Sequence, residues 1–226
     1  MTIDAKNILV SYTKNGKKDH TISIINSVDI NIVPGKVTVI FGRSGSGKTT
    51  LISVLAGLLK PQEGSVLYDD IDLYQQNDDF ISDFRSKNIG FIPQGQSLLN
   101  NLTIKENILL ANNHGNDSDR ADELIELLGL SEREEYLASQ LSGGELRRCA
   151  IARALINQPS VVFADEPTGD LDDYNTQIVF ELLRQKAKDG AAVVIVTHDE
   201  SAYNYADIVY RMDGGAFISV GDCNPD

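Results

Sequence analysis

The 226-residue chain has few of the features that mark secreted or membrane-inserted proteins. It contains two cysteines, Cys149 and Cys223, which are too few for a disulfide framework and fit a reducing cytoplasm. The longest apolar runs, such as residues 191–196, are far shorter than the roughly 20 residues that a membrane-spanning helix needs. The opening residues also lack the apolar core of a signal peptide. We therefore expect a cytoplasmic chain without direct membrane insertion, which reaches a membrane only through a partner.

Basic side chains are scarce as well. The chain has 20 Lys and Arg against 33 Asp and Glu, which gives a formal charge of −13. A nucleic-acid partner would require a basic face, so none is expected, and docking on anionic lipid is also disfavoured. Most of the excess of acidic over basic side chains lies between residues 69 and 140, which carry 15 acidic and 5 basic side chains. This block is either solvated surface or a surface that meets a basic partner.

The hydrophobic pattern predicts an α/β fold. Continuous apolar, β-branched segments alternate with segments of helical periodicity, which indicates a mostly parallel sheet. The core strands are expected at 36–41, 161–164 and 192–197, with helices at 49–59 and 175–188. Shorter strands are expected at 8–12, 22–32, 65–68 and 89–93, and a polar turn at 14–19. Helices are expected near 79–87, 104–112 and 120–128, and a further helix starts after Ser142 and runs to residue 156.

These elements predict a single domain over residues 1–226. Residues 1–68 are expected to form an N-terminal β subdomain and the start of the core. Residues 69–140 are expected to form an inserted, acidic, α-helical subdomain, and residues 141–226 complete the core.

Residues 42–49 read GRSGSGKT and satisfy the phosphate-loop pattern G-x-x-x-x-G-K-[ST] between a predicted strand and a predicted helix. Glycines let successive backbone N–H groups turn toward a polyphosphate, and the helix N-terminus adds partial positive charge. We expect Lys48 to reach the β- and γ-phosphates and the Thr49 hydroxyl to hold Mg²⁺. The expected nucleotide-binding residues of this segment are Gly42, Arg43, Ser44, Gly45, Ser46, Gly47, Lys48, Thr49 and Thr50.

Two acidic residues end the apolar strand in residues 161–166, which read VVFADE. A carboxylate at the end of a buried strand is costly unless it serves a cation. Asp165 is therefore expected to contact Mg²⁺, directly or through water, and Glu166 to polarise an attacking water.

A second candidate anion site lies at residues 141–145, LSGGE, at the start of a long helix. Ser142 can cap this helix, and Gly143 and Gly144 leave bare N–H groups at its N-terminus. One nucleotide does not need both this site and the phosphate loop of the same subunit.

The motifs GRSGSGKT, LSGGE, VVFADEP and VTHD occur in this order over nearly the whole chain, which resembles the ATP-binding cassette (ABC) transporter ATPases. The resemblance implies a P-loop NTPase core with a mostly parallel sheet, an N-terminal antiparallel β subdomain and an inserted α-helical subdomain. It also implies a head-to-tail homodimer in which each ATP lies between Lys48 of one copy and Ser142, Gly143, Gly144 and Glu145 of the other.

Four further positions carry roles through the resemblance. Gln94 looks like the Q-loop glutamine that touches Mg²⁺ and the attacking water, and His198 looks like the switch histidine that contacts the γ-phosphate. Asp172, in GDLD, looks like the D-loop residue that crosses the dimer interface. Tyr12 looks like the aromatic residue that stacks on adenine.

Two positions depart from the family pattern. Glu145 stands where Gln is commonest and adds a negative charge beside the expected polyphosphate, so altered affinity is expected. Asp170 stands at a D-loop position that is often Asn or Ala, which predicts a modest change at the dimer interface.

Together these features predict an enzyme that hydrolyses ATP with Mg²⁺, in which Lys48, Glu166, His198 and Gln94 act in phosphoryl transfer to water. The resemblance implies a membrane permease partner and a peripheral place on the inner face of the cell membrane.

The stretch ADEPTGDLD resembles a cassette group that includes lipoprotein-releasing, macrolide-exporting, cell-division and antimicrobial-peptide systems. It favours export or extraction of a peptide, lipopeptide or lipoprotein. The alternative is a cassette that signals through a membrane partner without transport. A DNA-repair or translation cassette is disfavoured by the single cassette and the acidic surface, and a GTPase by the lack of an N-K-x-D motif.

Overall fold

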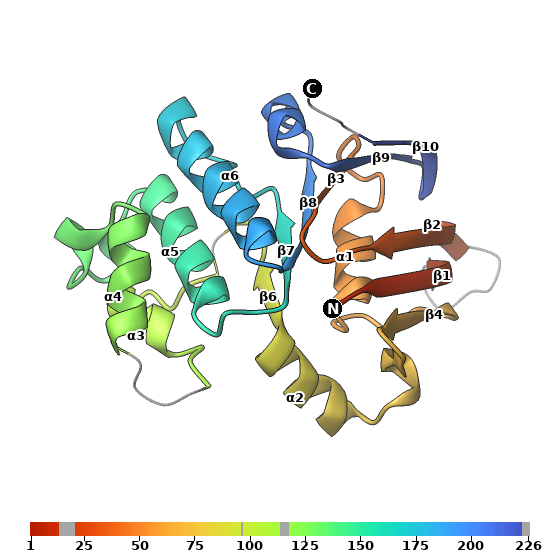
Figure 1. The fold of residues 1–226 in the computed structure, drawn as a ribbon, viewed down its shortest axis with the longest axis horizontal. Helices are drawn as coiled ribbons and strands as arrows, with labels where there is room; N and C mark the ends of the chain where they lie inside the picture. Colours follow the sequence, from red (N-terminus) through yellow and green to blue (C-terminus); the bar gives the residue numbers. More distant parts are fainter. Residues whose placement is uncertain (14–20, 96, 114–117, 223–226) are drawn as a thin grey trace.

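The computed structural model describes residues 1–13, 21–95, 97–113 and 118–222. The polar turn expected at 14–19 and Cys223 lie outside these ranges. A six-stranded sheet with the order β10-β9-β3-β8-β7-β6 runs through the centre of the molecule (Figure 1). Strands β9, β3, β8, β7 and β6 are parallel to one another, and β10 is antiparallel to β9. The strands are β3 (Val37–Phe41), β6 (Ile89–Ile92), β7 (Val161–Asp165), β8 (Ala192–Thr197), β9 (Ile208–Asp213) and β10 (Ala216–Asp222). The predicted mostly parallel core is confirmed.

Both faces of this sheet are covered, and β3, β7 and β8 are buried along their whole length. Successive side chains of a strand point to opposite faces. Phe163 and Val194 therefore pack in one apolar cluster, whereas Val162 and Val193 pack in another. Burial on both sides explains why these strands read as uninterrupted apolar runs.

An antiparallel sheet with the order β2-β1-β4-β5 packs on one side of the core, as predicted for the N-terminal part of the chain. Its strands are β1 (Ile3–Thr13), β2 (Thr21–Ile32), β4 (Glu63–Tyr68) and β5 (Ile71–Asp72). Helix α1 (Lys48–Leu55) lies between the two sheets and shares their apolar cluster. The loop that precedes α1 is therefore held by both sheets.

Helices α3 (Ile104–Leu109), α4 (Ser118–Leu127) and α5 (Gly143–Leu155) gather at one end of the molecule (Figure 1). Helix α5 contacts β6, and α3 and α4 pack on α5, while α6 (Asp173–Lys188) contacts β3 and β8. Helix α2 (Asp78–Asn88) packs elsewhere: its Ile81 and Phe84 join the cluster of α1 and the antiparallel sheet. The acidic stretch from 69 to 140 is thus divided between two packing groups.

Some element boundaries expected from the sequence are wrong. Helix α1 ends at Leu55 and not at residue 59, because Gly57 adopts the left-handed conformation (φ 69°), which ends a helix. Helix α3 ends at Leu109 and not at residue 112. Strands β9 and β10 were not predicted, since β9 exposes alternate side chains and so lacks the continuous apolar run of the core strands.

In the described part of the chain, no helix has both the length and the apolar character required to span a membrane.

Candidate functional site

The phosphate loop connects the end of β3 at Phe41 to the start of α1 at Lys48. Gly47 caps α1 with φ 103°, a left-handed conformation that favours glycine. A Cβ at Gly47 would also meet the backbone oxygen of Ile24 at 2.7 Å. The local sequence therefore places the loop against the N-terminal antiparallel sheet and opens the helix N-terminus toward a cavity.

This cavity has a volume of about 610 Å³. It brings together most of the residues predicted from four separate segments: the phosphate loop and the ends of β6, β7 and β8. Ile24, from the antiparallel sheet, also lines it and was not predicted. The predicted residues that line the cavity are Arg43, Ser44, Gly45, Gly47, Lys48, Thr49, Thr50, Gln94, Asp165, Glu166 and His198.

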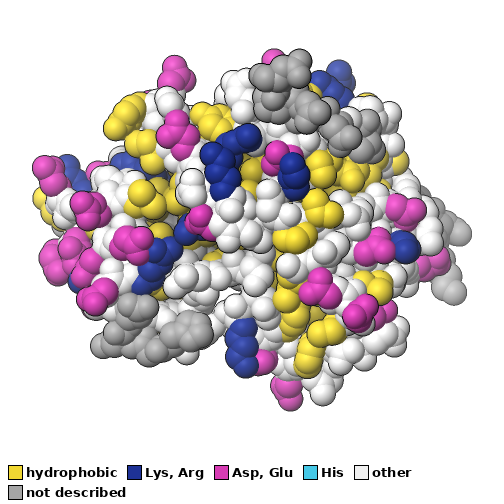
Figure 2. Space-filling model, in the orientation of Figure 1, with side chains coloured by type: hydrophobic (Ala, Val, Ile, Leu, Met, Phe, Trp, Pro, Cys, Tyr) yellow, Lys and Arg dark blue, Asp and Glu magenta, His cyan; other side chains and the backbone are white. Residues whose placement is uncertain are grey.

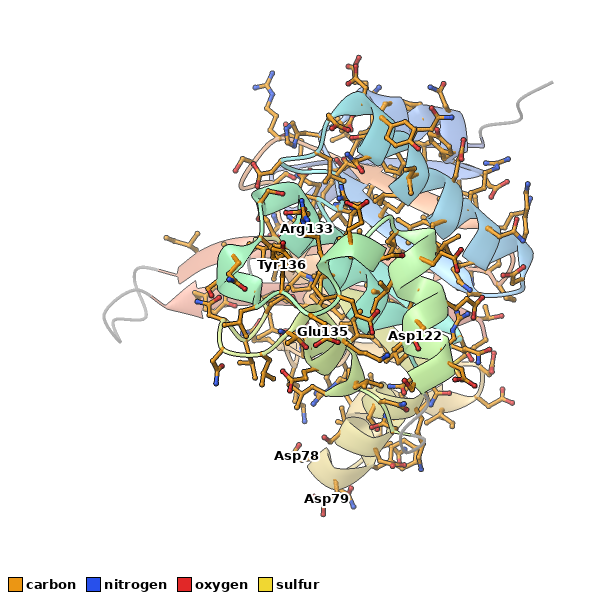
Figure 3. The ribbon with its side chains drawn as sticks, turned by 90° about the vertical axis from the view of Figure 1, so that its left-hand side faces the viewer. Asp78, Asp79, Asp122, Arg133, Glu135 and Tyr136 are labelled. Atoms are coloured by element: carbon orange, nitrogen blue, oxygen red, sulfur yellow. The ribbon has the colours of Figure 1, made fainter. Side chains whose placement is uncertain are left out.

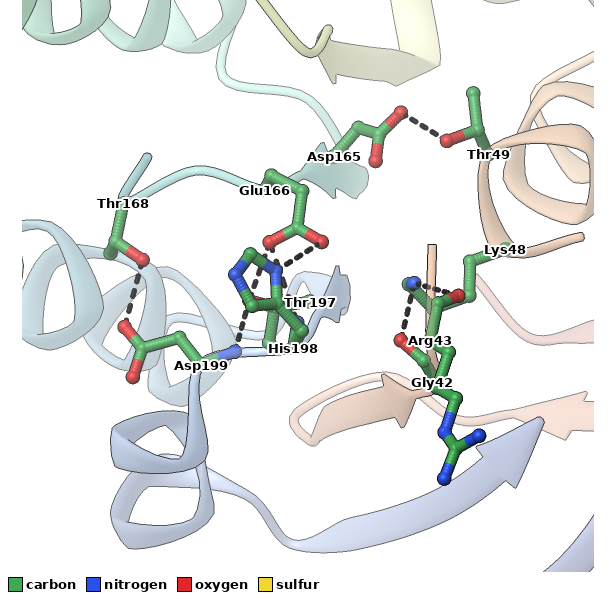
Figure 4. Close-up of polar contacts among 10 residues, drawn as sticks. All are labelled: Gly42, Arg43, Lys48, Thr49, Asp165, Glu166, Thr168, Thr197, His198 and Asp199. Atoms are coloured by element: carbon green, nitrogen blue, oxygen red, sulfur yellow. Dashed lines mark hydrogen bonds and ion pairs between the residues drawn. The ribbon is translucent and has the colours of Figure 1, made fainter. Parts of the chain in front are cut away.

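Lys48 is 7% exposed, and its ammonium group is bound by its own loop (Figure 4). The Nζ atom donates to the backbone oxygens of Gly42 at 2.7 Å and Arg43 at 3.2 Å. An ammonium has three donors, so these bonds leave one for an anion in the cavity. The buried Ser46 Oγ has no hydrogen-bond partner among the described residues. Lys48 therefore offers a donor that a polyphosphate can bind, whereas Ser46 does not line the cavity.

Asp165 and Thr49 face each other across the cavity (Figure 4), and the Thr49 hydroxyl donates to the Asp165 carboxylate at 2.7 Å. Asp165 is 2% exposed, and burial raises the pKa of its carboxyl, against the opposing effects of Thr49 and Lys48. Hydroxyl and carboxylate oxygens are the donors that Mg²⁺ prefers, and Gln94 adds a carbonyl oxygen to the same cavity. The residues present therefore fit a magnesium ion.

Glu166 follows β7 and is held by the end of β8 (Figure 4). Its backbone N–H donates to the backbone oxygen of Val196 at 2.9 Å. Its φ angle of 47° is uncommon for a residue other than glycine. Thr197 Oγ1 donates to Glu166 Oε2 at 2.8 Å, and His198 Nδ1 lies 3.0 Å from Oε1. Strained backbone that neighbouring strands hold in place is a feature of functional sites.

The side chains of Glu166 and His198 differ in exposure. The Glu166 side chain is 14% exposed, whereas that of His198 is 78% exposed. The carboxylate is therefore largely enclosed by protein, whereas most of the imidazole surface is open to solvent.

Two threonines and an aspartate that support this cluster were not predicted. Thr197 accepts from the backbone N–H of Asp199 at 3.0 Å while it holds Glu166, and Thr168 donates to the Asp199 carboxylate at 3.1 Å. In the sequence, Thr197 could have been recognised as a hydroxyl residue that ends a buried strand and directly precedes the histidine of VTHD. Asp199 and Thr168 tie the residues after β8 to those after β7.

The LSGGE residues lie at the start of α5 and do not line the cavity. Ser142 is the N-cap of α5, and Gly143 and Gly144 form its first turn. Asp172 caps α6 by accepting from the backbone N–H of Asn175 at 2.8 Å. A single copy of the chain therefore presents these predicted anion-binding groups away from its own phosphate loop.

Tyr12 lies on β1 and is 51% exposed. It is not among the residues that line the cavity. Its exposed ring offers an apolar surface on the same antiparallel sheet that contributes Ile24.

Comparison with known proteins identifies the family. Residues 25–169 match the ABC transporter family. The chain is 40% identical, over 94% of its length and 92% of the relative, to the lipoprotein-releasing system ATP-binding protein LolD 2 of Chlorobium chlorochromatii. It is 36% identical over 90% of its length to the macrolide export ATP-binding/permease protein MacB of Mannheimia succiniciproducens, of which it covers 32%.

Solved structures agree with this assignment. The dimeric structure of MJ0796, a bacterial ABC transporter cassette, matches 99% of this chain and 100% of its own with a TM-score of 0.91 and 32% identity. MJ0796 in a dimeric post-hydrolysis state with ADP and Pi matches with the same TM-score. With its phosphate loop, its strand-end carboxylates and these relatives, the chain belongs to the ABC transporter family and is an ATPase cassette of that family.

Proposed function

We propose that this chain hydrolyses ATP at the cavity between the phosphate loop and the ends of β7 and β8. The observation that carries the proposal is the convergence of Lys48, Thr49, Asp165 and Glu166 on one cavity. The loop amides and Lys48 bind the phosphates. During the reaction, their positive charge also offsets the negative charge that develops on the γ-phosphoryl group.

Thr49, Asp165 and Gln94 would hold a Mg²⁺ ion, which would supply charge neutralisation to the phosphates. Glu166 accepts the proton of the attacking water, and the Thr197 hydroxyl bond keeps its carboxylate in place. His198 leaves Glu166 and donates to the γ-phosphate.

We further propose that two copies close head to tail on ATP. Ser142, Gly143 and Gly144 do not line the cavity of their own copy, and in this proposal they bind the nucleotide held by the second copy. The dimeric structures of the relative MJ0796, one of them with ADP and Pi, support the dimer part of this proposal. Asp172 is the N-cap of α6 and follows Asp170 and Leu171, which lie close to Gly143 and Gly144. Tyr12, which is exposed, would stack on the adenine.

The membrane partner is proposed to be a permease, which places the chain at the inner face of the cell membrane. The names of the LolD and MacB relatives favour export or extraction of a lipoprotein, lipopeptide or peptide. Figure 2 shows acidic side chains gathered over the end of the molecule formed by α3 and α4. A basic loop of the permease would complement them. The second candidate, signalling without transport, keeps the same ATPase site.

Reconstitution with the permease in lipid vesicles tests this proposal. Phosphate release and movement of a labelled lipoprotein are measured with ATP, with and without Mg²⁺. We expect Mg²⁺-dependent phosphate release coupled to substrate movement. Phosphate release without movement of any lipoprotein or peptide substrate would favour the signalling role. No phosphate release in either condition would reject the proposed ATPase site.

A further inference from the structure

The signature serine is bound by its own neighbour, Glu145. Glu145 Oε2 accepts from the backbone N–H and from the hydroxyl of Ser142, both at 2.8 Å, and the Glu145 backbone N–H donates to Ser142 Oγ at 3.3 Å. A hydroxyl has one proton to donate. In the free chain that proton goes to Glu145, so the carboxylate competes with any phosphate for Ser142.

These hydrogen bonds also keep Glu145 charged. The bond from the Ser142 backbone lowers the pKa of the Glu145 carboxyl, and the Ser142 hydroxyl and Arg133 add to the effect. If a second copy presents its triphosphate here, as proposed above, a fixed negative charge lies beside it. Like charges brought together at an interface reduce affinity.

Arg133 offsets this charge from a different element. It ends the short 3-10 helix Ser131–Arg133, and its Nε donates to Glu145 Oε1 at 3.1 Å. It is the one basic side chain within ion-pair distance of Glu145 in the part of the chain that the structure describes. The guanidinium also lies 5.0 Å from the centre of the Tyr136 ring, which holds it in place (Figure 3).

The other basic side chains nearby bind other partners. Arg148 lies beside Gly144 and donates to Asn175 Oδ1 at 2.5 Å, and Lys105 is paired with Glu134 at 2.8 Å and with Asp122. The side chains of Arg133 and Glu145 are 40% and 20% exposed, so a second copy can reach both. Figure 3 shows Arg133 and Tyr136 together near the helices at this end of the molecule.

We infer that Arg133 is a positioning residue for the signature site. It pairs with Glu145 Oε1 and offsets the negative charge that this carboxylate would present to the approaching nucleotide. Ser142 and the amides of Gly143 and Gly144 can then bind the triphosphate of a second copy. This inference rests on the proposed head-to-tail dimer and explains how the chain accommodates Glu145 in its signature motif.

The test measures ATP-dependent dimerisation in a Glu166→Gln background, which slows ATP turnover. Four chains are compared: the background alone and with Arg133→Gln, Glu145→Gln, or both. Losing a partly exposed counter-charge weakens each site about threefold. Because a dimer has two such sites, we expect Arg133→Gln to raise the dimer dissociation constant about tenfold. The Glu145→Gln change should restore dimerisation to the Arg133→Gln chain, since no charge is left to offset.

Controls separate positioning from folding. Arg133→Lys keeps the charge and should retain most of the dimerisation. Lys87→Gln removes an equally positive, 62% exposed side chain from its pair with Asp83 on α2, and should change nothing.

The inference is overturned if Arg133→Gln dimerises like the background, or if Glu145→Gln does not suppress its defect. If the background itself binds ATP but never dimerises, the proposed dimer fails and this inference falls with it.

Discussion

Replacement of Glu166 by glutamine is expected to slow ATP hydrolysis by at least about 100-fold and to trap an ATP-bound dimer. Positioned acid–base groups contribute factors of about 10² to 10⁴ to catalysis. Glutamine keeps the size of the side chain and still accepts from the Thr197 hydroxyl, but it cannot take a proton from water. ATP binding should remain, because within the described part of the chain the Glu166 carboxylate bonds to Thr197 and His198 and not to the phosphate loop.

Phosphate release and dimer mass, measured on the same sample, check this expectation. Glu126→Gln, an exposed position on α4, makes the same chemical change away from the cavity and should hydrolyse ATP normally. A Glu166→Gln chain that hydrolyses ATP at the normal rate would show that another group activates the water.

Replacement of Lys48 by alanine is expected to weaken ATP binding about 100-fold. The Nζ group has one donor free for the phosphates, and a hydrogen bond between charged groups contributes up to about 3 kcal/mol. The change also removes the bonds to Gly42 and Arg43 that hold the loop around the cavity. Because the proposed dimer forms around bound ATP, a chain that binds little ATP should no longer dimerise when ATP is added.

Binding of a fluorescent ATP analogue to the purified chain measures this loss. Lys60→Ala, at an exposed position after α1, is the matched control and should bind normally. Unchanged affinity in the Lys48→Ala chain would mean that the loop amides alone hold the phosphates.

The sequence predicted those parts of the site whose geometry is local. The phosphate loop is one uninterrupted segment, and the apolar runs of β7 and β8 place Asp165 and His198 at strand ends. The parallel register of β7 and β8 then brings the ends of these two strands together. Asp165 pairs with Val196, so Glu166 and Thr197, which follow them, are neighbours. The sequence does not reveal that register, which is why the bond from Thr197 to Glu166 was missed.

Other contacts depend on packing between distant segments. Ile24 reaches the cavity because the antiparallel sheet packs against α1, which no motif encodes. The pairing of Arg133 with Glu145 joins a short 3-10 helix to the start of α5, and helical periodicity carries no signal for it. Strands β9 and β10 lack a continuous apolar run, so their place at the edge of the sheet was also not predicted.

Mixing two defective chains tests most directly the central claim that each ATP is bound by two copies. In the Glu166→Gln background, one chain carries Lys48→Ala and the other Gly144→Asp, which adds a negative charge to the signature amides. In a head-to-tail dimer of one chain of each kind, one site combines the intact Lys48 with the intact signature motif. The account predicts that neither chain dimerises alone, whereas the mixture forms ATP-dependent dimers with one nucleotide each, measured with differently labelled chains. A mixture that dimerises no better than its components would contradict it.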